Sequence, residues 1–208
     1  MTLDLETKNQ TTIAKQSLQS TQRMTLQKLR LGTQSATMKR SMILADISAS
    51  MSGEKLRALK AALNAVWSPV IEAIAFNNEL FELEQKDVDY LKNKGGTYMR
   101  SALQEAWQRR PSHIILATDG DPTDADDTEI LDMAMEYTEI PIDTIGIGQY
   151  DTSSYNPDFL RRLSEITGGT FTDVGQPIML TQVMKQLLLD YNKKVLNAPQ
   201  TKGGVISL

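Results

Sequence analysis

The fold of this chain is decided by residues 42–50, which read Met-Ile-Leu-Ala-Asp-Ile-Ser-Ala-Ser. The four apolar residues are typical of a short buried strand, and Asp46 follows them directly. Beyond Gly53, apolar residues recur at the spacing of one helix face. We therefore expect Asp46 to lie at the end of an interior strand, where the chain turns towards a helix.

Residues 113–121, His-Ile-Ile-Leu-Ala-Thr-Asp-Gly-Asp, repeat this arrangement. An apolar run again ends in an acid, Asp119, and the acids within 124–127 are suited to start a helix. In an open α/β sheet, ligands bind outside the carboxyl ends of the strands, where the strand order reverses. If these two strands are neighbours, Asp46 and Asp119 meet at that place.

Hydroxyl groups accompany both acids. Ser48 and Ser50 follow the first one, and Thr97 follows two glycines in a third segment, Gly95-Gly96-Thr97. Carboxylate and hydroxyl oxygens are the donors that a hard divalent cation such as Mg²⁺ requires. The three segments together predict a site for Mg²⁺ or Mn²⁺.

Composition and length indicate one globular domain. The chain has 208 residues, of which 40% are hydrophobic and 23% charged. It has no cysteine and a single histidine, His113, which excludes disulfides, thiolate metal sites and a histidine-rich zinc site. No apolar stretch approaches the ~20 residues of a membrane span, and the first residues lack the pattern of a signal peptide. We expect a cytoplasmic protein with no membrane partner.

Charge and composition divide the chain into three parts. Residues 1–40 carry a net charge of +5 and fit neither a helical nor a strand period, so we treat them as a basic extension. Residues 192–208 carry +3 and contain Pro199 and two glycines, which predicts a mobile tail. The domain itself, residues 41–191, carries −12. Basic ends can indicate a nucleic-acid partner, but such tails are more often simply solvated, so we do not expect one.

Strands and helices alternate along the domain. The expected strands after the first are residues 70–76, 80–83, 114–117, 141–147 and 170–174, and the expected helices are residues 98–109, 128–137, 157–167 and one that Pro177 opens. The first two of these strands read as a hairpin around Asn77-Asn78, which places an antiparallel strand at one edge. This order predicts an α/β fold with a doubly wound, mostly parallel sheet and helices on both faces.

The chain resembles a von Willebrand factor A (vWA) domain with a complete metal-ion-dependent adhesion site (MIDAS). The pattern of that site is Asp-x-Ser-x-Ser, then a loop threonine, then a loop aspartate, and the resemblance extends over residues 41–191. It includes the supporting segments Ile-Gly-Ile-Gly at 145–148 and Thr-Gly-Gly-Thr-Phe at 167–171. The resemblance implies a Rossmann-like, six-stranded sheet of order 3-2-1-4-5-6, with the site between strands 1 and 4.

The resemblance also implies a role for each matching residue. Ser48 and Ser50 would bind the ion directly, Asp46 would orient the serines or act through water, and Thr97 and Asp119 would exchange roles. The ion would keep an open position for an acidic residue of a partner protein. Such a module is not an enzyme, and its cofactor is Mg²⁺ or Mn²⁺.

Other interpretations remain open for several residues. The two serines also suit the start of the helix beyond Gly53, since serine is a common helix cap. Asp121 either supports the site or forms a turn before Pro122. We expect the rim of the site, or the residues just behind its ligands, to include Met51, Gly96, Tyr98 and Asp121.

Two other functions are weighed against the protein-binding module. Several acids at strand ends are also typical of a metal-dependent nuclease or phosphoesterase, although such enzymes usually need more carboxylates and a general base. Some relatives act as vWA partner subunits of an AAA-type ATPase or a chelatase complex, and that role is the second alternative.

Overall fold

The computed structural model describes residues 40–148 and 155–197. The chain separates into two units, residues 1–39 and 40–208, and every described residue belongs to the second. The basic extension expected at residues 1–40 therefore lies outside the described residues except for Arg40.

Six strands of the described residues form one sheet. They are β1 (Ser41–Asp46), β2 (Ile71–Phe76), β3 (Leu80–Glu82), β4 (His113–Thr118), β5 (Ile142–Ile147) and β6 (Phe171–Val174). Their order is β3-β2-β1-β4-β5-β6, with β3 antiparallel to β2 and all other neighbours parallel. The expected fold class, the antiparallel edge and the strand order are confirmed.

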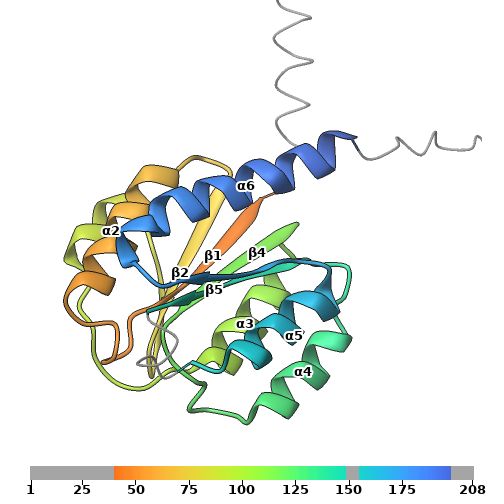
Figure 1. Ribbon diagram of the computed structural model, residues 1–208, viewed down its shortest axis with the longest axis horizontal. Helices are drawn as coiled ribbons and strands as arrows, with labels where there is room; N and C mark the ends of the chain where they lie inside the picture. The colour runs from red at the N-terminus through yellow and green to blue at the C-terminus, as the bar shows by residue number, and fades with distance from the viewer. Residues whose placement is uncertain (1–39, 149–154, 198–208) are drawn as a thin grey trace, which may run out of the picture. The chain divides into compact units, whose positions relative to one another are not determined.

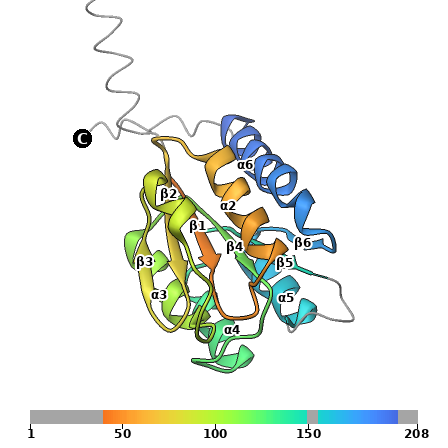
Figure 2. The ribbon, with the colours of Figure 1, turned by 90° about the vertical axis from the view of Figure 1, so that its left-hand side faces the viewer.

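Helices cover both faces of this sheet (Figure 1). They are α2 (Glu54–Val66), α3 (Met99–Arg109), α4 (Asp127–Met135), α5 (Pro157–Thr167) and α6 (Leu180–Asn197), with short 3₁₀ helices η1 (Gln85–Tyr90) and η2 (Pro177–Met179). The helices α2 and α6 lie on one face, and α3, α4 and α5 lie on the other (Figures 1 and 2). None of the helices in the described part of the chain is long and apolar enough to cross a membrane.

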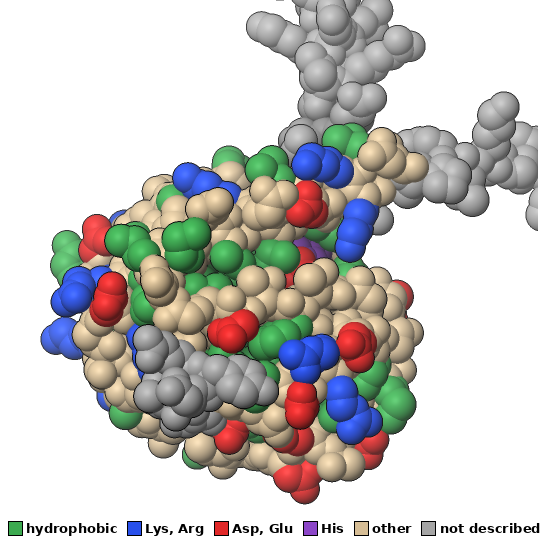
Figure 3. Space-filling model, viewed as in Figure 1, with side chains coloured by type: hydrophobic (Ala, Val, Ile, Leu, Met, Phe, Trp, Pro, Cys, Tyr) green, Lys and Arg blue, Asp and Glu red, His purple; other side chains and the backbone are tan. Residues whose placement is uncertain are grey.

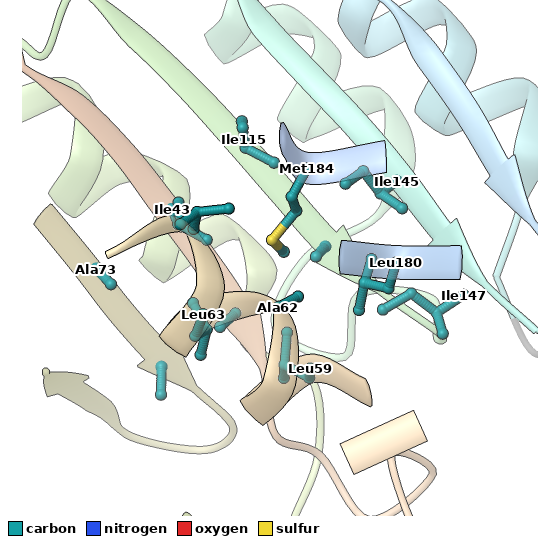
Figure 4. Close-up of a cluster of buried hydrophobic side chains, with 14 of the residues drawn as sticks. Ile43, Leu59, Ala62, Leu63, Ala73, Ile115, Ile145, Ile147, Leu180 and Met184 are labelled. Atoms are coloured by element: carbon teal, nitrogen blue, oxygen red, sulfur yellow. The ribbon is translucent and has the colours of Figure 1, made fainter. Parts of the chain in front are cut away.

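The central strands are buried on both faces, which explains their continuous apolar runs. On one face, Ile43 and Ile115 pack with Leu63 of α2 and Met184 of α6 (Figure 4). On the other face, alternate residues such as Leu44 pack beneath α3, α4 and α5. The two layers bury all six residues of β1 and of β4. Asp46 is the last residue of β1, so its backbone is held in a well-packed strand.

Two features differ from the expected elements. The short helix η1 was not expected; it is stabilised by a capping box in which the side chains of Glu84 and Asp87 each accept a hydrogen bond from the other's backbone N–H. The domain was expected to end at residue 191, whereas α6 continues without a break to Asn197. Lysine and aspartate side chains lie along its last turns (Figure 3), and a lysine near a helix C-terminus interacts favourably with the helix dipole. Residues 198–208 of the expected tail lie outside the described residues.

The register of the sheet places the ends of β1 and β4 side by side. Ala45 lies opposite Ala117, so Asp46 and Thr118 leave the sheet together. The strand order reverses at this pair, because the sheet continues from β1 to β2 in one direction and from β4 to β5 in the other. The helix after β1, α2, covers one face of the sheet, and the helix after β4, α4, covers the other. In Figure 2 the arrowhead of β1 points into the loop that leads to α2. This loop, the loop after β4 and the loop before α3 carry the residues of the candidate site.

Candidate metal centre

Asp46 ends β1 and is fully buried. Its Oδ1 accepts a hydrogen bond of 2.7 Å from the backbone N–H of Ser48. Its Oδ2 accepts one of 2.6 Å from the hydroxyl of Thr118, at the end of the neighbouring strand. The carboxylate therefore ties its own loop to β4 and fixes the turn that carries the serines.

Ser48, Ser50 and Asp119 form a continuous chain of hydrogen bonds. The hydroxyl oxygens of the two serines lie 2.9 Å apart. The Ser50 hydroxyl donates to Oδ1 of Asp119 at 2.7 Å, across 69 positions of sequence. Because Ser50 uses its proton in that bond, Ser48 donates to Ser50. Asp119 and Ser48 are buried while Ser50 is exposed, so the chain of bonds leads from the interior to the surface.

Thr97 joins this group from the loop that precedes α3. It is buried, and its Oγ1 lies 3.4 Å from the point where a Cβ on Gly120 would stand. The Oγ of Ser50 lies 3.6 Å from the same point. The two hydroxyls therefore flank the space beside Gly120, and a side chain at this position would fill the space between them.

The loops that carry Thr97 and Asp119 are fastened to each other. The N–H of Thr97 donates to Oγ1 of Thr123, and the N–H of Thr123 donates to the carbonyl of Thr97, both at 2.9 Å. Asp124 adds a further link, because its carboxylate accepts hydrogen bonds from the backbone N–H groups of Arg100 and Ser101 in the first turn of α3. Asp124 was expected to start α4; it caps α3 instead, and Asp126 is the N-cap of α4.

A basic residue completes the polar contacts of Asp119. The ammonium of Lys55 lies 2.5 Å from Oδ2 of Asp119. The lysine side chain is 25% exposed and that of Asp119 is 0% exposed. Since Oδ1 is bound by Ser50, both oxygens of Asp119 have a partner.

Burial raises the pKa of Asp46 from 3.8 to about 6. The hydrogen bonds from Thr118 and Ser48 act in the opposite direction, and the nearby charge of Asp119 raises the pKa further. Burial also raises the pKa of Asp121, against a hydrogen bond from the backbone N–H of Asn156. A bound divalent cation would favour the ionised form of such groups.

The structure decides between some of the open interpretations. Gly53 is the N-cap of α2 and no side chain caps this helix, so the idea that Ser48 or Ser50 does so is wrong. Met51 is also not a rim residue: its apolar side chain is 0% exposed and packs in the core. An unbranched apolar side chain is more stable there than in water.

The other three expected rim residues lie near the site. Tyr98 and Gly96 are half-buried beside Thr97. A Cβ on Gly96 would stand 2.7 Å from Oγ1 of Thr123, so the close approach of the two loops requires glycine there. Asp121 is exposed and binds the N–H of Asn156, just before α5.

Sequence reasoning missed three residues of the site: Lys55, Thr118 and Thr123. Thr118 lies within residues 113–121, but no role was expected for its hydroxyl. A weak signal existed for Lys55, because it stands in the first turn of a helix, where the dipole disfavours a cation. No signal in the sequence indicates that Thr123 reaches Thr97.

The donor set fits a hard divalent cation. Five oxygen-bearing side chains from three loops meet: Asp46, Ser48, Ser50, Thr97 and Asp119. Among the residues described, no group of three or more His, Cys, Asp or Glu side chains could hold a metal. Any metal bound in this region would therefore depend on hydroxyl oxygens, as Mg²⁺ and Mn²⁺ can.

Comparison with solved structures supports the fold. BatB from Bacteroides thetaiotaomicron has a TM-score of 0.58 at 15% identity, over 74% of this chain and 99% of that one. The ArnB paralog VWA2 from Sulfolobus acidocaldarius has a TM-score of 0.51 at 22% identity, over 69% and 43%. Proximal thread matrix protein 1 from the mussel byssus, in a form with a zinc-occupied MIDAS motif, has 0.53 at 14%, over 72% and 47%. No curated protein matches the sequence.

The sequence itself matches the von Willebrand factor type A domain over residues 39–81 and 75–173. These segments include all five oxygen-bearing residues of the site and β1 to β5. Modules of this family take part in metal-dependent protein interactions. On the match and the strand order together, the chain belongs to the von Willebrand factor type A domain family.

Proposed function

We propose that this domain binds Mg²⁺ or Mn²⁺ in a MIDAS and, through the ion, an acidic residue of a partner protein. The observation that carries the proposal is the chain of hydrogen bonds from Ser48 through Ser50 to Asp119. It aligns two hydroxyl oxygens and a carboxylate next to Thr97. A bound ion would supply an electrophilic position for a carboxylate.

Each side chain has a task in this proposal. Ser48, Ser50 and Thr97 supply neutral oxygens, which leave positive charge on the ion. Asp46 holds the loop of the serines through the Ser48 N–H, and Asp119 orients Ser50. Because three of the five groups are hydroxyls, the site is suited to holding an electrophile and not to activating a water, so we propose that the protein is not an enzyme.

The surface beside the site favours a protein partner. A hollow of about 510 Å³ is lined by Lys55 and, from η2, by Pro177 and Ile178, and the side chain of Ile178 is 74% exposed. A second hollow of about 360 Å³ is lined by Ile47, between Asp46 and Ser48, and by Lys94. Apolar and basic groups on both sides of the site suit a segment that combines an acidic residue with apolar neighbours.

The test uses two serines of the same loop. Titration calorimetry of the wild type should show one Mg²⁺ or Mn²⁺ site. Ser50→Ala should weaken binding by about tenfold or more, because it removes an oxygen and releases Asp119. Ser52→Ala is the matched control, since this exposed serine offers only its backbone to the loop. Equal affinities of the three proteins would refute the site.

The partner is tested with the immobilised domain and a cell extract. A partner should be retained in Mg²⁺, released by EDTA, and lost with Thr97→Ala in Mg²⁺. Retention that is the same in EDTA would place the interaction on another surface. Mn²⁺-dependent cleavage of plasmid DNA or a phosphodiester, lost in Asp119→Ala, would favour the nuclease alternative instead.

A further inference from the structure

Lys55 places a positive charge next to the oxygen atoms of the site, although a cation is not needed to bind a metal ion there. Its ammonium contacts Oδ2 of Asp119, which is fully buried. It stands in the first turn of α2, where the helix dipole disfavours a cation. The contact with Asp119 therefore accounts for its position, and the helix does not.

In the metal-free site, Lys55 offsets one of two negative charges. Asp46 and Asp119 are two fully buried carboxylates, and the hydroxyls around them are neutral. Among the ion pairs of the described residues, Lys55 provides the one that involves either carboxylate. Lysine and the two acids sum to −1, and a divalent ion in addition gives +1.

We propose that Lys55 is a built-in counter-ion, which stabilises the metal-free site and competes with the metal for Asp119. The part of the proposal that concerns the metal rests on the proposed function. An ammonium and a divalent cation that share one carboxylate repel each other strongly at this depth, because the surroundings screen charge poorly. The lysine therefore weakens metal binding.

The structure gives the ammonium a place to move. Lys55 also lines the hollow of about 510 Å³ beside the site, together with Ser52 and Glu54. Its side chain is 25% exposed, so part of it already faces solvent. When an ion binds Asp119, the flexible lysine side chain can turn into this hollow without moving α2.

The first experiment measures metal affinity. Lys55→Met removes the charge and keeps the length of the side chain. The dissociation constant for Mg²⁺ should fall by about tenfold. Lys60→Met is the control: it lies on the same helix, carries the same charge, and binds the carbonyl of Asp89 away from the site. Lys55→Arg should keep the wild-type affinity.

The direction of the change separates this role from a structural one. If Lys55 merely held Asp119 in place, its loss would weaken Mg²⁺ binding. An unchanged or weaker affinity in Lys55→Met therefore overturns the competition. Lys55→Gln keeps a hydrogen-bond donor without a charge and should behave as Lys55→Met does; wild-type affinity in this variant would also overturn it.

The second experiment needs no metal. In EDTA, Lys55→Met should melt roughly 5 °C below the wild type, because it leaves Asp119 without a counter-ion. Lys60→Met should melt with the wild type. Saturating Mg²⁺ should remove the deficit of Lys55→Met. A wild type that binds no Mg²⁺ refutes the proposed function, whereas an unchanged melting temperature in EDTA refutes the counter-ion role by itself.

Discussion

The two ends of the central strands differ in how their buried charged groups are paired. At the amino end, His113 of β4 meets Asp143 of β5 at 2.8 Å, and the other oxygen of Asp143 accepts the N–H of Thr170. Tyr191 of α6 stacks on the His113 ring with centroids 4.3 Å apart and donates to the carbonyl of Ser112. At the carboxyl end lie two buried carboxylates. The one ion pair that the described residues make with either of them joins Asp119 to Lys55, while Asp46 accepts hydrogen bonds from uncharged groups.

This difference distinguishes a structural cluster from the proposed metal site. The amino end has one carboxylate, one imidazole and an aromatic cover. Both oxygens of its carboxylate are paired, whereas Nδ1 of His113 has no hydrogen-bond partner among the described residues. The carboxyl end retains surplus negative charge, and it is the end that raises the pKa of a carboxylate to about 6. A buried carboxylate with a raised pKa destabilises the folded protein, and such groups are typical of functional sites, where a bound ligand offsets the destabilisation.

Asp143→Ala should cost the most stability. It leaves the buried His113 ring and the N–H of Thr170 without their acceptor. This loss should lower the free energy of unfolding by about 4 kcal/mol. Urea unfolding measures this, and Mg²⁺ should restore none of it. Asp158→Ala is the control, because Asp158 pairs with Arg161 on the surface and is 80% exposed. A rescue by Mg²⁺ would mean that the two ends are coupled.

Asp46→Asn should stabilise the metal-free protein at high pH. The pKa of Asp46 rises from 3.8 in the unfolded chain to about 6 on folding, so the wild type loses stability as the pH rises from about 4 to 6. Above that range the loss is complete, and it amounts to roughly 3 kcal/mol. Asparagine has no charge and can still accept from Ser48 and donate to Thr118.

The measurement is urea unfolding in EDTA at pH 4 and pH 8. Asp46→Asn should exceed the wild type at pH 8 and lose that advantage at pH 4. Saturating Mg²⁺ should reverse the order at pH 8, since only the wild type gains from binding. Asp126→Asn, which keeps the N-cap of α4 on the surface, is the control. An advantage that is the same at both pH values would contradict the assigned cause.

Thr123→Val should have the smallest effect. It removes the oxygen that accepts the N–H of Thr97, which should cost about 1 kcal/mol and weaken Mg²⁺ binding by a few-fold. Thr123→Ser should retain both properties. The control is Thr128→Val, an exposed position in the first turn of α4. If Thr123→Val binds Mg²⁺ as the wild type does, the link between the two loops does not position Thr97.

The sequence predicts the fold well because the strands of a doubly wound sheet are strong local signals. The runs before Asp46 and Asp119 are continuous and apolar, and their ends locate the switch point. It does not predict η1, whose capping box lies in a polar segment without an apolar period. The continuation of α6 beyond residue 191 is missed for the same reason, since polar residues in its last turns resemble a tail.

The candidate site is predictable for the residues that share a motif. Asp46, Ser48 and Ser50 lie close together in the sequence, and Thr97 and Asp119 follow expected elements. The contacts of Lys55 and Thr123 depend on side chains from distant segments, and no local pattern encodes them. Met51 shows the opposite error: its place in the sequence beside two serines suggests exposure, whereas the turn directs it inwards.

The lengths of the strands bear on how copies of this protein meet. The four inner strands have six residues each, whereas the edge strands β3 and β6 have three and four. Another chain that added itself to either edge would find too few backbone groups for a stable ladder. The sheet is thereby protected from growing into β-aggregates at high concentration. In the proposed function, recognition falls to the loops at the end of the sheet, where specificity would depend on side chains and not on backbone pairing.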